Sequence, residues 1–222
     1  GVIFNSSHIL AGNFEKGMQA FLKKDFTSAL YEWKPLAKKG LAHAQSNLGV
    51  LYSQGLGVPI DNTKAVMWWT RAAKQGHAKA RFNLGVMYHK GKGVAPNAKK
   101  AEEWFVLAAN QGISKAQFNL GVMYDHGDGV KKNNKKAFKW YMLAASKGSA
   151  PAMTNLGVLY ALGKGVPLNY IEAYKWANLG GGNGNKKGAK LRDLVEKQLT
   201  ISQIEKAQEL GRKCLKTKYK QC

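Results

Sequence analysis

Four asparagines recur at intervals of 36 residues, and their side chains are well suited to bind another molecule. They are Asn47, Asn83, Asn119 and Asn155. A primary amide offers hydrogen-bond donors and an acceptor, so a row of amides suits the backbone of an extended peptide. The alternative is structural: each amide bonds to the backbone of the neighbouring unit.

Charged and aromatic residues accompany the two central asparagines. Lys79 and Lys115 lie four residues before them, and their ammonium groups favour an acidic side chain or a C-terminal carboxylate. Phe82 and Phe118 directly precede them and offer apolar anchors for a partner. Burial between successive helices is the other explanation for these two rings. This combination suits an extended, partly acidic protein segment.

Catalytic chemistry has little support in this chain. The five histidines are scattered along it, at His8, His43, His77, His89 and His126. No Ser/His/Asp or Cys/His arrangement can be recognised, so we expect no enzyme activity and no cofactor. Asp125 and His126 could form a metal pair with His89, but solvated polar side chains are the simpler explanation. We therefore expect no metal site.

A Gly-x-Gly-Val pattern also recurs with the 36-residue period, and it superficially looks like a phosphate-binding loop. It occupies Gly55–Val58, Gly91–Val94, Gly127–Val130 and Gly163–Val166. A dinucleotide-binding fingerprint needs a preceding strand, whereas a helical pattern precedes each copy here. We expect these glycines to end helices, where the backbone needs positive φ.

Two helices in each unit must position these side chains. In residues 42–54, Leu48 and Tyr52 fall on one side of a helix, and Asn47 falls on the opposite side. A second helix follows the glycine loop, and Trp68 on it is predicted to fill the interface between helices. Preferred N-cap residues precede this second helix in every unit, at Asp61, Asn97, Asn133 and Asn169.

The whole unit resembles the Sel1-like repeat, a relative of the tetratricopeptide repeat. The resemblance rests on the pattern A-x-x-N-L-G-x-x-Y-x-x-G-x-G-V…K-A-x-x-W…A-A-x-x-G, in four copies from Leu41 to about Gly184. It implies an all-α fold, a right-handed α-solenoid of antiparallel helix pairs whose first helices line a concave groove. It also implies a non-enzymatic adaptor that holds proteins or glycans. In the related tetratricopeptide arrays the asparagine side of the first helix is the peptide-binding face.

The resemblance begins and ends within the chain, and it therefore predicts three regions. Residues 1–40 form a divergent N-terminal helical pair, residues 41–184 form the repeats, and residues 185–222 form C-terminal capping helices with a basic tail. The four repeats are 41–76, 77–112, 113–148 and 149–184. In the last region, Thr200 followed by Gln203 has the pattern of a capping box and announces a final helix.

The chain has two cysteines, Cys214 and Cys222. On one continuous helix their Cα atoms would lie about 12 Å apart, which is too far for a disulfide. A bridge therefore requires the tail after Lys216 to leave the helix and fold back. The alternative is two unpaired surface thiols in a cytosolic protein. Secreted members of the resembling family can end with such a clip, which favours a periplasmic or secreted protein.

The formal net charge is +22, from 35 basic and 13 acidic residues. Such a charge attracts acidic polymers, namely acidic glycans, anionic lipid or nucleic acid, unless the lysines merely solvate the surface. The basic tail and five lysines near the third loop could bind such polyanions, which is our alternative function. The five are Lys131, Lys132, Lys135, Lys136 and Lys139. Without stacking aromatics or a recognition motif, we expect no specific nucleic-acid readout.

No stretch approaches the roughly 18 consecutive apolar residues of a membrane-spanning helix, so we expect no transmembrane segment. The chain begins at Gly1 rather than Met. We therefore expect that a preceding segment, either a targeting segment or a tag, has been removed.

Overall fold

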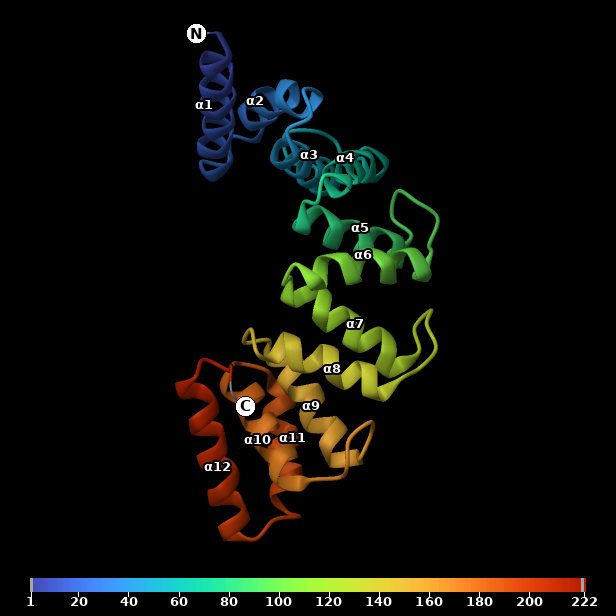
Figure 1. Cartoon of the computed structure of the whole chain (residues 1–222), viewed down its shortest axis with the longest axis vertical. Coiled ribbons are helices and arrows are strands. Elements are labelled where there is room, and N and C mark those ends of the chain that lie inside the picture. The colour runs from blue at the N-terminus through green and yellow to red at the C-terminus, as the bar shows by residue number, and fades with distance from the viewer. Residues whose placement is uncertain (1, 221) are drawn as a thin grey trace. The chain divides into compact units, whose positions relative to one another are not determined.

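The computed structural model describes residues 2–220 and 222, with side chains from residue 12 onward. This part of the chain holds twelve helices and no strand, and consecutive helices form antiparallel pairs (Figure 1). The predicted all-α class and the pairing of helices are confirmed. The helices are α1 (Val2–Leu22), α2 (Phe26–Lys38), α3 (Ala42–Gln54), α4 (Asn62–Lys74), α5 (Ala78–Lys90), α6 (Ala98–Asn110), α7 (Ser114–His126), α8 (Asn134–Ala145), α9 (Ala150–Leu162), α10 (Tyr170–Gly182), α11 (Lys186–Glu196) and α12 (Ile201–Lys216).

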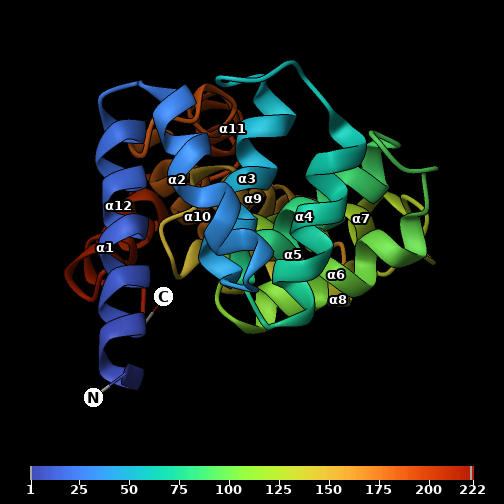
Figure 2. The same cartoon turned by 90° about the horizontal axis from the view of Figure 1, so that it is seen from above.

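The chain divides into two compact units. The first unit ends at Ala108, within α6, and the second begins at Ala109. In the first unit α1 runs beside α2, and α3 packs on both α2 and α4 (Figures 1 and 2). In the second unit α7 packs on α8 and α9 packs on α10.

A glycine facing an aromatic ring sets the close approach of the two helices in three of the repeats. A Cβ atom at Gly49 would overlap the Trp69 indole, and one at Gly85 would overlap the Phe105 ring. In the second unit Gly121 faces Tyr141 in the same way. These rings lie one residue after the tryptophan position predicted as core. Trp68 itself is buried, as predicted.

The loops between first and second helices bring two backbones together. Gly93 has φ +71°, and a Cβ atom there would collide with the backbone of Asn62 and Thr63 at the start of α4. The glycine pattern therefore serves a tight turn and a close backbone contact. The predicted N-caps follow these loops: Asp61, Asn97, Asn133 and Asn169 each accept a hydrogen bond from the backbone N–H three residues later, at 2.8–3.0 Å.

Side chains at one register tie each of the first three repeats to the helix before it. Each donates a hydrogen bond to a backbone carbonyl oxygen in the last turn of that helix. The pairs are Gln45 Nε2 with Ala37 at 3.0 Å, Arg81 Nε with Ala73 at 3.2 Å, and Gln117 Nε2 with Ala109 at 3.1 Å. The stacking of successive repeats thus includes a hydrogen bond to the last turn of the preceding second helix.

The last helix, α12, packs on α10, and the predicted capping box at Thr200 and Gln203 is present. After Lys216 the chain leaves the helix, with positive φ at Lys218 and Tyr219. This reversal brings the Cα atom of Cys222 to 4.7 Å from that of Cys214, and the two cysteines form a disulfide.

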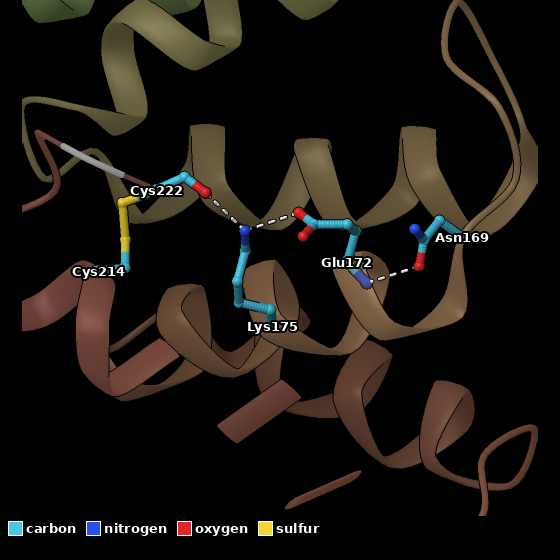
Figure 3. A network of polar contacts seen from close by, with 5 residues as sticks. All are labelled: Asn169, Glu172, Lys175, Cys214 and Cys222. Carbon is cyan, nitrogen blue, oxygen red and sulfur yellow. Dashed lines mark hydrogen bonds and ion pairs between the residues drawn. A yellow bond between two sulfur atoms is a disulfide. The ribbon is translucent and has the colours of Figure 1, made fainter. Parts of the chain in front are cut away.

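The closed tail covers a buried lysine of α10 (Figure 3). The side chain of Lys175 is 2% exposed. Its Nζ atom lies 2.7 Å from Glu172 Oε2 and donates to the backbone oxygen of Cys222 at 2.8 Å. The Tyr219 hydroxyl also hydrogen-bonds the Asn183 amide. Because a buried polar group needs hydrogen-bond partners, the oxygen that the tail supplies stabilises the buried position of Lys175.

Candidate functional site

We define the inner stripe as residues 43, 46, 47 and 50 of α3 and the residues 36 and 72 positions later on α5 and α7, together with 151, 154, 155 and 158 of α9. In the first repeat, Ser46 of this stripe is buried and Val50 packs against the core, whereas His43 and Asn47 retain exposed surface. The four asparagines of the inner stripe are all partly exposed. The predicted site therefore lies on an accessible surface in each repeat.

In the first unit the inner stripe opens into a pocket of about 400 Å³. Phe14, Met18 and Phe21 of α1 and Trp33 of α2 form its apolar part. The ring centroid of Trp33 lies 6.1 Å from that of Phe14 and 5.6 Å from that of Phe21. The Trp33 indole N–H donates to the backbone oxygen of Phe14 at 3.2 Å. This bond holds the large buried ring in place, so the apolar wall is preformed.

One lining residue of the pocket is smaller than its equivalents in the next two repeats. Ser46 lines the pocket, whereas the following two repeats have Phe82 and Phe118 at this register. Phe82 packs on Phe105, with ring centroids 5.9 Å apart. Ser46 instead accepts a hydrogen bond from the Trp69 indole through its backbone oxygen, at 3.1 Å. A small side chain therefore lines the pocket at a register where the next two repeats carry a phenyl ring.

Polar groups of the stripe complete the pocket. The amides of Asn47 and Asn83 line it, together with the ammonium group of Lys79. The Asn47 amide donates only to the sulfur of Met18, at 3.6 Å, which is a weak bond. Within the described part of the chain, no hydrogen bond engages the Asn83 side chain. The Asn83 amide is therefore available to a ligand.

Two histidines also line the pocket, with their rings edge to face and centroids 4.9 Å apart. They are His43 and His77. His77 is the N-cap of α5, and its Nδ1 atom accepts from the Ala80 backbone N–H at 3.2 Å. Burial lowers the pKa of His77, and the nearby His43 and Lys79 lower it further. The neutral ring that this favours is the form able to accept the capping bond.

The family model for the Sel1 repeat matches residues 42–77, 78–113, 114–149 and 150–185. The chain belongs to the Sel1 repeat family. The matched repeats begin one residue later than the predicted ones. Sel1 repeat proteins are in general non-catalytic scaffolds for protein interactions.

Solved structures of Sel1 repeat proteins resemble this chain. A Sel1 repeat protein from Oxalobacter formigenes is 33% identical with a TM-score of 0.75, over 79% of this chain and 72% of that one. The protein c5321, a protective antigen present in uropathogenic Escherichia coli strains, is 29% identical with a TM-score of 0.62. That match covers 95% of this chain but only 54% of c5321, so the present chain spans about half its length.

A Sel1 repeat protein from Klebsiella pneumoniae shares the fold alone, at 19% identity and a TM-score of 0.55, over 84% of this chain and 93% of that one. None of the curated proteins matches the chain.

The second unit carries the remaining predicted residues of the stripe on its Sel1 repeats. Lys115 is exposed, and Asn119 is half-buried with no side-chain hydrogen bond among the described residues. Phe118 packs on Tyr141, at 5.9 Å between centroids. Asn155 interacts with the Tyr141 hydroxyl, which also bonds Asp125 at 3.4 Å. These side chains thus lie on the inner stripe of the second unit.

The contacts of the four asparagines and of Phe82 and Phe118 show what structural role these side chains have. Over the described residues, no amide of the four asparagines bonds to the backbone of a neighbouring repeat. Phe82 and Phe118 are partly buried, and they pack on second-helix rings of their own repeats, Phe105 and Tyr141.

Sequence reasoning missed the contribution of α1 to the pocket. The helix lacks the Asn-Leu-Gly-Val pattern, so it was expected only as part of a divergent pair. The signal was nevertheless present, because Phe14, Met18 and Phe21 follow at i, i+4 and i+7, an apolar stripe on one face of a helix.

Metal chemistry gains no support from the arrangement of side chains. In the part of the chain described here, no group of three or more His, Cys, Asp or Glu residues is placed to hold an ion. The His43–His77 pair has no third ligand among the residues that line the pocket.

Proposed function

We propose that this Sel1 repeat protein is a non-enzymatic scaffold that binds an extended, partly acidic segment of another protein along its inner stripe. The pocket of the first unit carries the proposal. It combines a preformed apolar wall with a few polar groups that can orient a ligand, which is the usual composition of a binding site.

The polar groups of the stripe match an extended peptide backbone. An amide such as that of Asn83, which has no hydrogen-bond partner among the described residues, gains more from a ligand hydrogen bond than one already satisfied. Lys79 beside it, and the net charge of +22, favour a partner that carries carboxylates. The same residue types continue on the second unit as Lys115 and Asn119.

The double variant Asn83→Ala with Asn119→Ala tests this function. We expect it to fold as the wild type does, because neither amide hydrogen-bonds within the described chain, but to lose capture of the partner in pulldowns from the native organism. Asn110→Ala is the control, since Asn110 is exposed at the end of the second helix α6. A folded double variant that captures the same protein as strongly as the wild type would show that the stripe is not the binding surface.

We further propose that the protein works in the periplasm or outside the cell. The Cys214–Cys222 disulfide supports an oxidising compartment, where such bonds persist. The described residues include no helix of the length and apolarity needed to cross a bilayer. Trapping free thiols in native cells before lysis tests the proposal by mass spectrometry: a bonded pair is expected, and two alkylated cysteines would oppose it.

Polyanion binding is the second candidate, and the lysines near the third loop favour it. Lys131, Lys132, Lys135, Lys136 and Lys139 are all exposed in the second unit. A protein that binds through such charges elutes from heparin only at high salt, and its affinity for nucleic acid falls steeply with salt whatever the base sequence. Peptide binding in the pocket, by contrast, depends on the apolar side chain of the peptide.

A further inference from the structure

We infer that the pocket of the first unit selects a segment in which one large apolar side chain, preferably aromatic, directly adjoins an Asp or Glu. The inference rests on the proposed function and names the chemistry of the partner. The apolar side chain enters between α1 and α3, and the carboxylate of its neighbour meets Lys79 on α5.

The apolar wall fits a ring. Phe14, Phe21 and Trp33 present three aromatic surfaces, and aromatic rings attract one another in tilted and edge-to-face arrangements. Met18 lies among them, and its flexible thioether adapts to side chains of different shape. At about 400 Å³ the pocket holds one large side chain and its adjoining backbone, rather than a longer apolar segment.

The charges around the pocket are one-sided. None of the side chains lining it in the described chain is acidic. Lys79 is exposed on the first turn of α5, a turn that contains no acidic residue. The positive end of the α5 helix dipole lies at the same place and also favours an anion. A carboxylate next to the bound ring therefore finds a cation and a helix N-terminus that lack an acidic partner.

The amides can hold the backbone of the bound segment near the ring. Asn47 and Asn83 stand at the same register on successive first helices, and both line the pocket. Each can donate to and accept from a backbone peptide unit on either side of the ring. This arrangement limits the carboxylate to a position close to the ring in the sequence of the partner.

The chain itself marks the pocket as particular to this repeat. At the register of Ser46 the next two repeats place Phe82 and Phe118 against their own second-helix rings. In the first repeat the corresponding second-helix ring, Trp69, donates to the Ser46 backbone oxygen and is not among the residues that line the pocket. A phenyl group from the partner would instead meet the rings of α1 and α2, namely Phe14, Phe21 and Trp33.

Three short peptides, acetylated, amidated and labelled, test the inference by fluorescence anisotropy with the oxidised full chain. Their centres are Phe-Asp, Ala-Asp and Phe-Asn in an otherwise identical Gly/Ser/Thr background, so the only carboxylate is the Asp side chain. We expect Phe-Asp to bind at least about tenfold more tightly than either of the others. Equal affinities, or no binding of Phe-Asp, would overturn the inference.

Two matched charge reversals identify the cation. Lys79→Glu and Lys99→Glu change the net charge equally, and Lys99 is exposed in the first turn of α6, outside the inner stripe. We expect Lys79→Glu to weaken Phe-Asp binding by about tenfold and to leave Phe-Asn unchanged, with less than about a twofold effect from Lys99→Glu. Equal losses in both variants would show general charge attraction instead of recognition at the pocket.

The aromatic contact has its own readout, which needs no variant. In an amide and indole NMR spectrum, the Phe-Asp peptide should shift the indole N–H signal of Trp33 and leave that of Trp176, which is buried in the second unit, unmoved. Ser46→Phe, which fills the pocket with the residue of the next repeats, should abolish that shift. An unchanged Trp33 signal at saturating peptide would contradict the placement.

Competition separates this inference from the proposed function. An excess of Phe-Asp peptide should release the captured partner, and Ala-Asp should not. A partner that is lost from the Asn83/Asn119 double variant but is not released by Phe-Asp would support the scaffold function and refute the motif. A partner captured equally by the double variant would refute the scaffold function, whatever the peptides do.

Discussion

The imidazole of His77 couples the pocket to the start of α5. Its Nδ1 atom caps the helix by accepting from Ala80, and its pKa is lowered by burial, by His43 and by Lys79. A proton on this nitrogen would remove the acceptor and place a positive charge near Lys79. The folded state therefore binds this proton less readily than the unfolded chain does.

We predict that His77→Asn makes the stability of the first unit less dependent on pH. The wild type should lose free energy of unfolding as the pH falls below about 6.5, because the unfolded histidine takes up a proton at its ordinary pKa while the folded one resists it. Asparagine keeps an acceptor at the N-cap and does not titrate. Urea unfolding near neutral and acidic pH measures the difference, and equal losses in both proteins would contradict it.

Individual residues show how much of the proposed binding surface could be predicted from the sequence. Asn47, Asn83 and Lys79 were selected from their types and spacing, and all three line the pocket. Their role in binding remains a prediction. Ser46 could not be recognised, because neither its residue type nor its place in the repeat pattern marks it as a residue that lines a pocket.

Among the elements, the loop from α5 to α6 depends most plainly on a close backbone contact. Gly93 lies against the first residues of α4, at positive φ. Gly40 has a similar φ of +99°, but no atom lies within 4 Å of the Cβ position. Substitutions at these two glycines can therefore distinguish the cost of positive φ from the cost of steric overlap.

We predict that Gly93→Ala destabilises the first unit more than Gly40→Ala does. The left-handed conformation costs an alanine about 1–2 kcal/mol at either site. Overlap with α4 should add about 1–3 kcal/mol at Gly93 alone. Urea unfolding of both variants beside the wild type gives the two values, and similar values would show that the loop yields without cost.

Helix boundaries were predictable wherever the repeat pattern supplied both a stop and a start. Glycine after the first helix and Asp61 or an equivalent asparagine before the second are local signals, and the structure contains both. The boundaries and contacts of α1 were harder to predict. This helix lacks the repeat pattern, and the positions of its side chains depend on packing against α2 and α3. The pocket was missed for the same reason: it joins side chains distant in sequence, such as Phe14 and Asn83.

In the molecule as a whole, the ends differ from the repeats that they flank. α12 packs back on α10, and the tail beyond it closes through Cys214 and Cys222. The corresponding lysine in the preceding repeat, Lys139, is exposed, whereas Lys175 is buried. The C-terminal region thus covers a surface that the preceding repeat leaves open.

We predict that replacing both cysteines by serine destabilises the second unit by roughly 2–3 kcal/mol, the loop entropy expected for so short a closed segment. It should also expose Lys175, because Cys222 no longer holds its backbone oxygen on the ammonium group. Amine-reactive labelling followed by peptide mapping measures this, with the exposed Lys136 as the control that labels in both proteins. Protection of Lys175 in the serine variant would show that the tail stays in place without the bridge.

Because the C-terminal tail is closed by a disulfide, its state depends on how the protein is produced. Protein made in a reducing cytosol and protein exported before it folds would share one sequence, yet only the second would carry the sealed end. Batches for binding work should therefore be produced by export and titrated for thiols, since a mixture of sealed and open ends would melt over a broad range of temperature.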